Sequence, residues 1–284
     1  MATLQKHRVT SLRGLERVAL GDFGGNQRDI PWIVANAAHP ECWHRLADTT
    51  EPGVVYTYGM HPLVVSEGRR LLSEDALRSL LSHPRVRGVG ECGLDTSRCK
   101  TDQEAESMLR GQEEAFRMQL QLAKELDLVA VIHLRGRTPQ ENNTLQHRGM
   151  SIMSAILPKK HPVHVHCFAG NHDSYTAWIH HFPRAMFGFT SKVSQEAFQE
   201  VAHTIFPEKL LLESDAPYLT PQSIQVQRRH AANSPYYLPE NLISLGRAVN
   251  LPIRILGPLV THNCMVLYRI TVRGDPASQS IQVH

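Results

Sequence analysis

Seven short apolar runs alternate with helical patterns between about residue 30 and residue 216. In chain order the runs are WIVANA, GVVYTYG, VRGVGE, LVAVIH, PVHVHCF, AMFGFT and LLLESD. Apolar runs of this length are typical of strands that are buried on both faces. Strands that alternate with helices at this spacing predict an α/β fold with a parallel sheet. Seven of them favour a distorted (β/α)8 barrel of the TIM type over an open sheet, although the count is one short of eight.

Three of the intervening segments have clear helical patterns. SEDALRSLLS begins with Ser73, which is a suitable N-cap residue. QEEAFRMQLQLAKELD, at residues 112–127, places its apolar side chains on one stripe, formed by Phe116, Leu120, Ala123 and Leu126. SQEAFQEVAHTIF, at residues 194–206, follows the run AMFGFT and has the same character.

The composition indicates a globular chain, with 42% hydrophobic and 20% charged residues. No apolar segment approaches the roughly 20 residues of a membrane-spanning helix, so we expect no membrane contact. The five cysteines are scattered and form no CxxC pair, which favours reduced thiols in the cytoplasm or nucleus. We expect one domain over residues 1–284, ending in a polar tail at 271–284. The net charge of +3 permits a polyanionic substrate without arguing for one.

A side chain able to bind metal stands at the end of four of the predicted strands. These are Glu91 after VRGVG, His133 after VAVI, His166 in VHVHCF and Asp215 in LLLESD. One such residue is more often structural, but four at the carboxyl ends of barrel strands favour a shared site. Two imidazoles and two carboxylates suit Zn²⁺, Mn²⁺ or Mg²⁺ in a hydrolytic centre. Such ions generate hydroxide at neutral pH and stabilise charge on a phosphoryl or carbonyl oxygen.

Several blocks of the sequence resemble the TatD-like metal-dependent deoxyribonucleases in order and spacing. They are GVGECGLD, VIHLRG, HVHCFAG and LLLESDAPYLTP, together with YGMHP, NSP and HNCMVLY. The likeness runs from about residue 30 to residue 270, and HCFAG and FGFTSKV bring it nearest to the animal TATDN-type branch. The resemblance implies a distorted TIM barrel with a two-metal site that cleaves phosphodiester bonds in DNA, with RNA as an alternative substrate.

The resemblance also implies roles for the residues at the strand ends. Glu91, His133 and His166 would be metal ligands, with Glu91 bridging. Asp215 would ligate metal and position or deprotonate the attacking water, which makes Asp215 and Glu91 the predicted catalytic residues. Glu213 could accept a hydrogen bond from a ligand histidine or form a plain buried ion pair.

Other residues are candidates for contact with the substrate. His61 of GMHP could contact a phosphate or stabilise its own loop. Arg135 could clamp a phosphate oxygen, or form a salt bridge to a nearby acid, Asp95 or Glu213. Tyr218 could stack on a base or line the pocket wall. His164 faces the same way as the ligand histidine but lies deeper, so we expect it in the core.

One block of the family is missing from the first part of the sequence. The family begins with a strand that bears a His-x-His motif and supplies two ligands to one metal, whereas His7 is the only histidine before Trp32. Apolar residues at helical spacing predict a first helix over residues 11–20 whose preceding strand is absent. We therefore expect residues 1–29 to be divergent or truncated, as in a shortened splice product. The barrel would be unclosed, and the site would bind one metal well and cleave DNA weakly.

Two further interpretations remain open at this point. An amidohydrolase-type barrel that acts on a small molecule would share the strand-end ligands, although GECGLD and ESDAPY favour the nuclease. The missing His-x-His favours a degenerate barrel that is retained for binding or interaction. The sequence decides neither the metal nor the oligomeric state.

Overall fold

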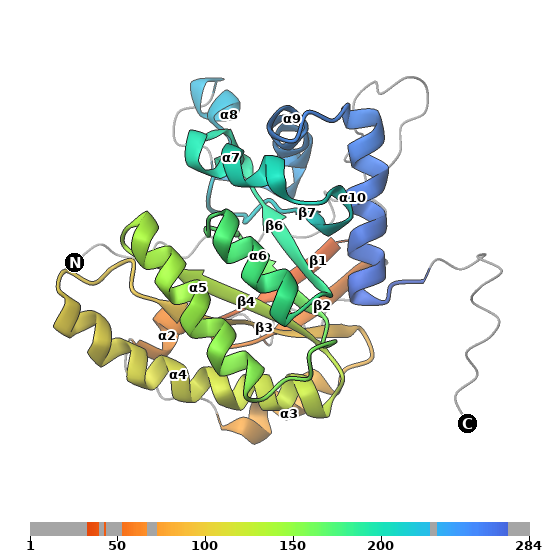
Figure 1. Cartoon of the computed structure of the whole chain (residues 1–284). Helices are drawn as coiled ribbons and strands as arrows, with labels where there is room; N and C mark the ends of the chain where they lie inside the picture. The colour runs from red at the N-terminus through yellow and green to blue at the C-terminus, as the bar shows by residue number, and fades with distance from the viewer. Residues whose placement is uncertain (1–32, 40–42, 44–52, 67–72, 228–231, 272–284) are drawn as a thin grey trace.

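The computed structural model describes residues 33–39, 43, 53–66, 73–227 and 232–271 (Figure 1). The predicted helix over residues 11–20 lies outside the described residues, as do the segment 1–29 and all but the first residue of the tail. The predictions for those segments, including the absent first strand, therefore stay predictions.

Seven parallel strands form one sheet, in the order of the chain. The strands are β1 (Ile33–Ala37), β2 (Val54–Tyr58), β3 (Val86–Asp95), β4 (Val129–Arg135), β5 (Val163–His166), β6 (Ala185–Phe189) and β7 (Leu210–Leu212). Each of them falls within one of the predicted apolar runs or overlaps it. The sheet is curled, and helices alternate with its strands, which makes a TIM-like half-barrel and confirms the predicted fold class (Figure 1).

The helices follow the strands along the chain. They are α2 (Pro62–Ser66), α3 (Glu74–Leu81), α4 (Asp102–Glu125), α5 (Pro139–Ser154), α6 (His172–His181), α7 (Glu196–Thr204), α8 (Gln222–Gln227), α9 (Leu238–Ala248) and α10 (Ile253–Tyr268), with short 3-10 turns η2 (Ser191–Ser194), η3 (Pro207–Lys209) and η4 (Pro235–Tyr237). Ser73 caps α3 as predicted, because its hydroxyl accepts the N–H of Ala76. The helix α4 begins at Asp102, before the predicted stretch, where Thr101 supplies the cap.

The two faces of the sheet have different partners because side chains alternate along each strand. Outward residues such as Ile132 and Phe187 join the main core, to which Phe116 of α4 and Trp178 of α6 also belong. Inward residues near the start of the strands form a second apolar cluster with the end of α10, made of Val55, Val129, Val131, Met186, Leu211, Leu267, Tyr268 and Ile270. Toward the carboxyl ends the inward positions become polar, so the candidate site rests on an apolar floor.

The last strand is shorter than predicted. β7 ends at Leu212, and only the N–H of Glu213 still pairs with the sheet, at 2.9 Å from the carbonyl of Phe189. Asp215 has a φ of 53°, which is left-handed and not extended. The prediction that the strand extends through LLLESD to Asp215 is therefore wrong: Glu213 and Asp215 both stand in the loop that follows it.

No single helix in the described part of the chain is both long and apolar enough to cross a bilayer. The segments Pro235–Ala248 and Ile253–Tyr268 reach that length only together, and they meet at a bend of 108°. Both contribute side chains to the protein core, among them Leu245 and Leu256.

Candidate metal centre

Glu91 projects from β3 toward the concave face of the sheet. Its carboxylate is nearly buried, and its Oε1 accepts a hydrogen bond from Asn36 Nδ2 at 3.2 Å. Thr57 in turn donates to Asn36 Oδ1 at 2.6 Å. The first two strands thus hold one oxygen of Glu91, and the other, Oε2, faces the histidines of β4 and β5.

His133, on β4, is held by an acid on its far side. Its Nε2 lies 2.9 Å from Asp95 Oδ2. Burial raises the pKa of Asp95, but the hydrogen bond and charge of His133, with two hydrogen bonds from Ser97, outweigh it and bring that pKa to about 2. Because the carboxylate is ionised, Nε2 donates its proton to Asp95, and Nδ1 is the nitrogen left to bind a metal ion. This Nδ1 is buried, has no hydrogen-bond partner in the described part of the chain, and lies 3.9 Å from Glu91 Oε2.

His166, on β5, is oriented in the same way. Strand pairing sets it directly beside His133. Its Nδ1 lies 2.8 Å from Glu213 Oε1, and the N–H of Cys167 donates to Glu213 Oε2 at 2.9 Å. Burial raises the pKa of Glu213, but the charges of His166 and His164 outweigh it and hold that pKa well below its usual value. Glu213 therefore accepts the proton on Nδ1, which leaves Nε2 of His166 at 3.4 Å from Glu91 Oε2.

Asp215 completes the cluster from the loop after β7. Its Oδ1 lies 3.7 Å from His166 Nε2. Burial, opposed by the charge of His166 and assisted by Glu91 and Glu213, raises the pKa of Asp215 to about 6. Several carboxylates this close together are unfavourable without a cation between them.

The four residues predicted from the strand ends are thus brought together. Ligand atoms of Glu91, His133 and His166 lie within 4.8 Å of one another, and His166 and Asp215 belong to a neighbouring group of the same size. The unpartnered Nδ1 of His133 and two carboxylates at one point are what a divalent cation would satisfy. These residues fit a metal ion.

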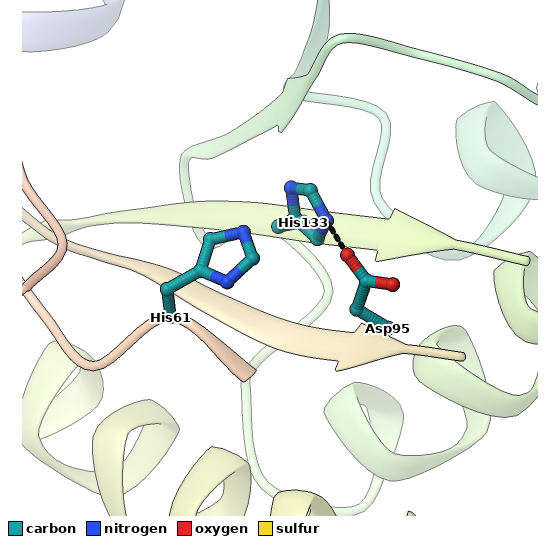
Figure 2. Close-up of side chains that lie close together, drawn as sticks. All are labelled: His61, Asp95 and His133. Carbon is teal, nitrogen blue, oxygen red and sulfur yellow. Dashed lines mark hydrogen bonds and ion pairs between the residues drawn. The ribbon is translucent and has the colours of Figure 1, made fainter. Parts of the chain in front are cut away.

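His61 stands beside His133, and the centroids of the two rings are 4.2 Å apart (Figure 2). Burial and the charge of His133 lower the pKa of His61 well below its usual value, so the ring is neutral. Its Nδ1 accepts the N–H of Leu63 at 3.2 Å, which puts the remaining proton on Nε2. Although His61, Asp95 and His133 could geometrically hold an ion, this Nε2–H is a donor and suits an oxygen better than a metal.

Arg135 and Tyr218 flank the centre. Arg135 donates from Nη2 to the carbonyl of Cys167 at 3.2 Å, and neither of its predicted salt bridges, to Asp95 or Glu213, is formed. Tyr218 is 62% exposed, on the loop that follows Asp215. Asn233, of the NSP block, ties that loop down by donating to the carbonyls of Ser214, Tyr218 and Leu219.

Two supporting features were missed by sequence reasoning. Asp95 was considered only as a partner for Arg135, although its position four residues beyond Glu91 on the same strand pointed to the same site. The second feature is a pair from distant segments: Tyr268 OH lies 2.6 Å from His164 Nδ1, and His164 Nε2 lies 2.7 Å from Glu213 Oε1. The pair joins residues 104 positions apart, and nothing in the local sequence marks it. His164 is buried, as predicted.

A TIM-like sheet with paired imidazoles and carboxylates at the carboxyl ends of its strands is typical of metal-dependent hydrolases. The comparison with known families agrees, because residues 30–269 match the model of the TatD related DNases. The chain belongs to this family, and with it to the hydrolases.

Curated relatives and solved structures point the same way. A protein of Pantoea ananatis named 3'-5' ssDNA/RNA exonuclease TatD is 30% identical over 237 residues, which cover 82% of this chain and 85% of the relative. Its Salmonella typhimurium counterpart is 34% identical over 210 residues, or 72% and 69% of the two chains. A TatD homologue from Escherichia coli K12 superposes with a TM-score of 0.67 at 22% identity, covering 85% and 87%. An Entamoeba histolytica TatD family hydrolase gives 0.64 at 18%, covering 89% and 94%. At such identities the structures support the fold alone.

Proposed function

We propose that this chain is a metal-dependent nuclease that hydrolyses phosphodiester bonds in DNA, with RNA as an alternative substrate. One observation carries the proposal. His133 and His166 each have one ring nitrogen within hydrogen-bond distance of an acid, Asp95 for the first and Glu213 for the second. Their other ring nitrogens face the carboxylates of Glu91 and Asp215. The relatives named as single-stranded DNA and RNA exonucleases support a nucleic acid as substrate.

In this proposal the metal is held by Glu91, His133 through Nδ1, His166 through Nε2, and Asp215. The mixed nitrogen and oxygen set suits Zn²⁺, Mn²⁺ or Mg²⁺. Such an ion, when bound, lowers the pKa of water and stabilises negative charge on the phosphoryl group.

The remaining residues of the site would orient the substrate and the water. Asp215, at the edge of the cluster, would accept a hydrogen bond from the attacking water and direct it to phosphorus. His61 would donate its Nε2–H, and Arg135 its free guanidinium N–H groups, to phosphate oxygens. The exposed ring of Tyr218 would stack on a base of a single strand.

The proposal also keeps the finer expectations from the sequence. The likeness of HCFAG and FGFTSKV to the animal branch supports placement there, and the one sheet spanned by the family match supports a single domain. Four cysteines, Cys92, Cys99, Cys167 and Cys264, are free thiols, which supports a cytoplasmic or nuclear location. Because no His-x-His precedes Trp32, we expect about one tightly bound metal ion per chain and weak cleavage.

Metal content and cleavage of a labelled single-stranded oligonucleotide test the function together. We expect Glu91→Ala and Asp215→Ala to abolish cleavage in Mg²⁺, Mn²⁺ or Zn²⁺ and to lower the bound metal. Glu114→Ala, which changes an exposed acid on the outer face of α4, is the matched control and should behave as the parent. If the two site variants cut as fast as the parent, the activity is a contaminant and the proposal fails.

The main competing function is binding without catalysis, favoured by the missing His-x-His motif. It predicts that the parent holds a metal ion and an oligonucleotide but leaves the strand intact over long incubation. An intact substrate in all three metals, with binding retained, would favour this function over the nuclease.

A further inference from the structure

Two positively charged side chains stand beside the metal centre, one on each side of β5. Arg135 ends β4, and Lys192 lies in η2, directly after β6. The two strands flank the one that carries His166. Both cations line one small cavity together with Cys167 and Thr190. They therefore share the end of the sheet at which the metal ligands gather.

Neither cation has an acidic partner among the residues that the structure describes. The guanidinium of Arg135 makes one hydrogen bond, to the carbonyl of Cys167 at 3.2 Å, which leaves its other N–H groups available. The hydrogen bonds of Lys192 among the described residues are those of its backbone: its N–H donates to Thr190 Oγ1 at 3.3 Å, and its carbonyl accepts the N–H of Gln195 at 2.9 Å. Its ammonium group forms no ion pair with any acid in the described ranges.

The two charges also destabilise each other. Burial, and then the charge of Arg135, lowers the pKa of Lys192, and Asp215 only partly opposes this. Holding two like charges together at half-buried positions costs free energy unless an anion lies between them. Elsewhere on this chain a half-buried arginine, Arg148, is paired with the acids Glu106 and Glu113. Two other half-buried cations, Arg87 and Lys209, also lack an acid but donate to backbone carbonyls, whereas the ammonium group of Lys192 has neither kind of partner within the described part of the molecule.

The cavity limits what that anion can be. Its volume is about 10 Å³, which is room for a single water-sized atom. Its walls include three aromatic rings, those of Phe168, Phe189 and Phe198. A base or a sugar does not fit, whereas one oxygen of a phosphate standing at the mouth does. Arginine and lysine side by side are suited to that oxygen, because one supplies a planar fork of donors and the other a point charge.

We propose that Lys192, together with Arg135, forms a phosphate subsite beside the metal centre. This inference rests on the proposed function and refines it: the subsite takes a phosphate of the strand next to the one being cleaved. That phosphate is either an internal phosphodiester or a terminal monophosphate. Lys192 is thereby a specificity-determining residue for a polyanionic strand.

Steady-state cleavage of short single-stranded oligonucleotides tests the subsite. Lys192→Met should raise KM about tenfold, the loss expected for one charge-assisted hydrogen bond, with kcat changed less than twofold. The slope of log(kcat/KM) against log[salt] should also become shallower by about one, the change expected when one phosphate contact is lost. Lys192→Arg should restore most of the KM. The control is Lys159→Met, an exposed lysine that precedes β5 at the opposite end of the sheet. An unchanged KM and salt slope in Lys192→Met would overturn the proposal.

Substrates of equal length with a 5'-phosphate, a 3'-phosphate or hydroxyl ends separate the two sources of the phosphate. If the subsite takes a terminal group, the effect of Lys192→Met appears only on the substrate that carries that phosphate. If it takes an internal phosphodiester, all three substrates lose affinity equally. Either pattern supports the subsite.

Binding of inorganic phosphate, followed by calorimetry, separates this proposal from the nuclease itself. We expect Lys192→Met to weaken phosphate binding about tenfold and Glu91→Ala, which removes a metal ligand, to retain it. Loss of phosphate binding in Lys192→Met without cleavage by the parent would support the subsite and reject the nuclease. Cleavage by the parent with equal phosphate binding in Lys192→Met would support the nuclease and reject the subsite. Circular dichroism and the thermal midpoint of each variant check that it is folded.

Discussion

At the scale of single residues, the decisive property of the candidate site is the position of a proton on each imidazole. Asp95 holds the proton of His133 on Nε2, and Glu213 holds that of His166 on Nδ1. Each histidine therefore turns its other ring nitrogen toward Glu91. Acids that orient ligand histidines in this way commonly change metal affinity by one or two orders of magnitude. Glu213 is supported further by His164, whose Nε2 lies 2.7 Å away.

The first residue-scale prediction concerns Glu213. Glu213→Gln keeps the size of the side chain but removes the charge that orders the proton of His166, so the affinity for Zn²⁺ or Mn²⁺ should fall about 10- to 100-fold. Calorimetric titration of the metal-free protein measures it. Glu208→Gln, an exposed acid before β7, is the control. Equal affinities in Glu213→Gln and the parent would show that this carboxylate does not orient the ligand.

At the scale of single elements, β3 stands out because it carries both Glu91 and Asp95. It also packs so closely against β4 that two of its positions have no room for a side chain. Gly93 has a φ of 147°, and a Cβ there would lie 2.0 Å from the carbonyl oxygen of His133. Gly90 has a φ of 140°, and its Cβ would lie 2.3 Å from the carbonyl oxygen of Val131. The close approach of the two backbones is what brings the acids of β3 within reach of His133.

This packing predicts opposite effects for two glycine substitutions. Gly93→Ala should lower the free energy of unfolding by more than about 2 kcal/mol, because both the backbone angle and the contact become unfavourable. Gly111→Ala, in the middle of α4, meets its nearest atom at 4.0 Å and should raise stability by about 0.5–1 kcal/mol. Urea denaturation of both variants measures the difference. A Gly93→Ala protein as stable as the parent would refute the close packing.

At the scale of the whole molecule, several acids in the described part of the chain have a lower pKa in the folded state than in the unfolded state. For Asp95, Glu141 and Glu213, burial raises the pKa, but histidine or arginine partners and hydrogen bonds outweigh it and lower the pKa below its usual value. Asp215 opposes this trend, because burial raises its pKa to about 6. Stability should therefore depend on pH in the acidic range.

The expected pH dependence follows from the sign of these shifts. A group whose pKa is lowered on folding stabilises the protein above its unfolded pKa, and this contribution is lost as the pH falls through the folded pKa. We therefore expect the metal-free protein to lose stability from about pH 5 toward pH 2, measured by urea denaturation at each pH. Glu141→Gln, which removes the negative charge that accepts hydrogen bonds from Arg137 and Thr96, should flatten the slope. A stability that rises on acidification would contradict the assignment.

The structure confirms the predicted fold class, whereas the roles of the predicted site residues stay predictions. Each of the seven strands was predicted, because a strand covered by helices must be apolar along most of its length. The strand-end positions also predicted that Glu91, His133, His166 and Asp215 lie at one end of the sheet, and the structure brings them close together there. The prediction was wrong for the end of β7, where the chain turns at Asp215 with a left-handed φ of 53°. The periodicity of apolar residues gives no information about a single backbone angle of this kind.

What the sequence determines by itself is the pattern that any folded form must satisfy: alternating strands and helices, apolar faces, and chemically competent groups at the carboxyl ends of strands. What only the tertiary structure decides is which groups meet. Tyr268 reaches His164, and Arg135 and Lys192 reach one cavity, because helix α10 and the strands β4 and β6 converge in space. Such contacts depend on the curvature and register of the whole sheet, which are collective properties of the packed chain and leave no local mark on the sequence.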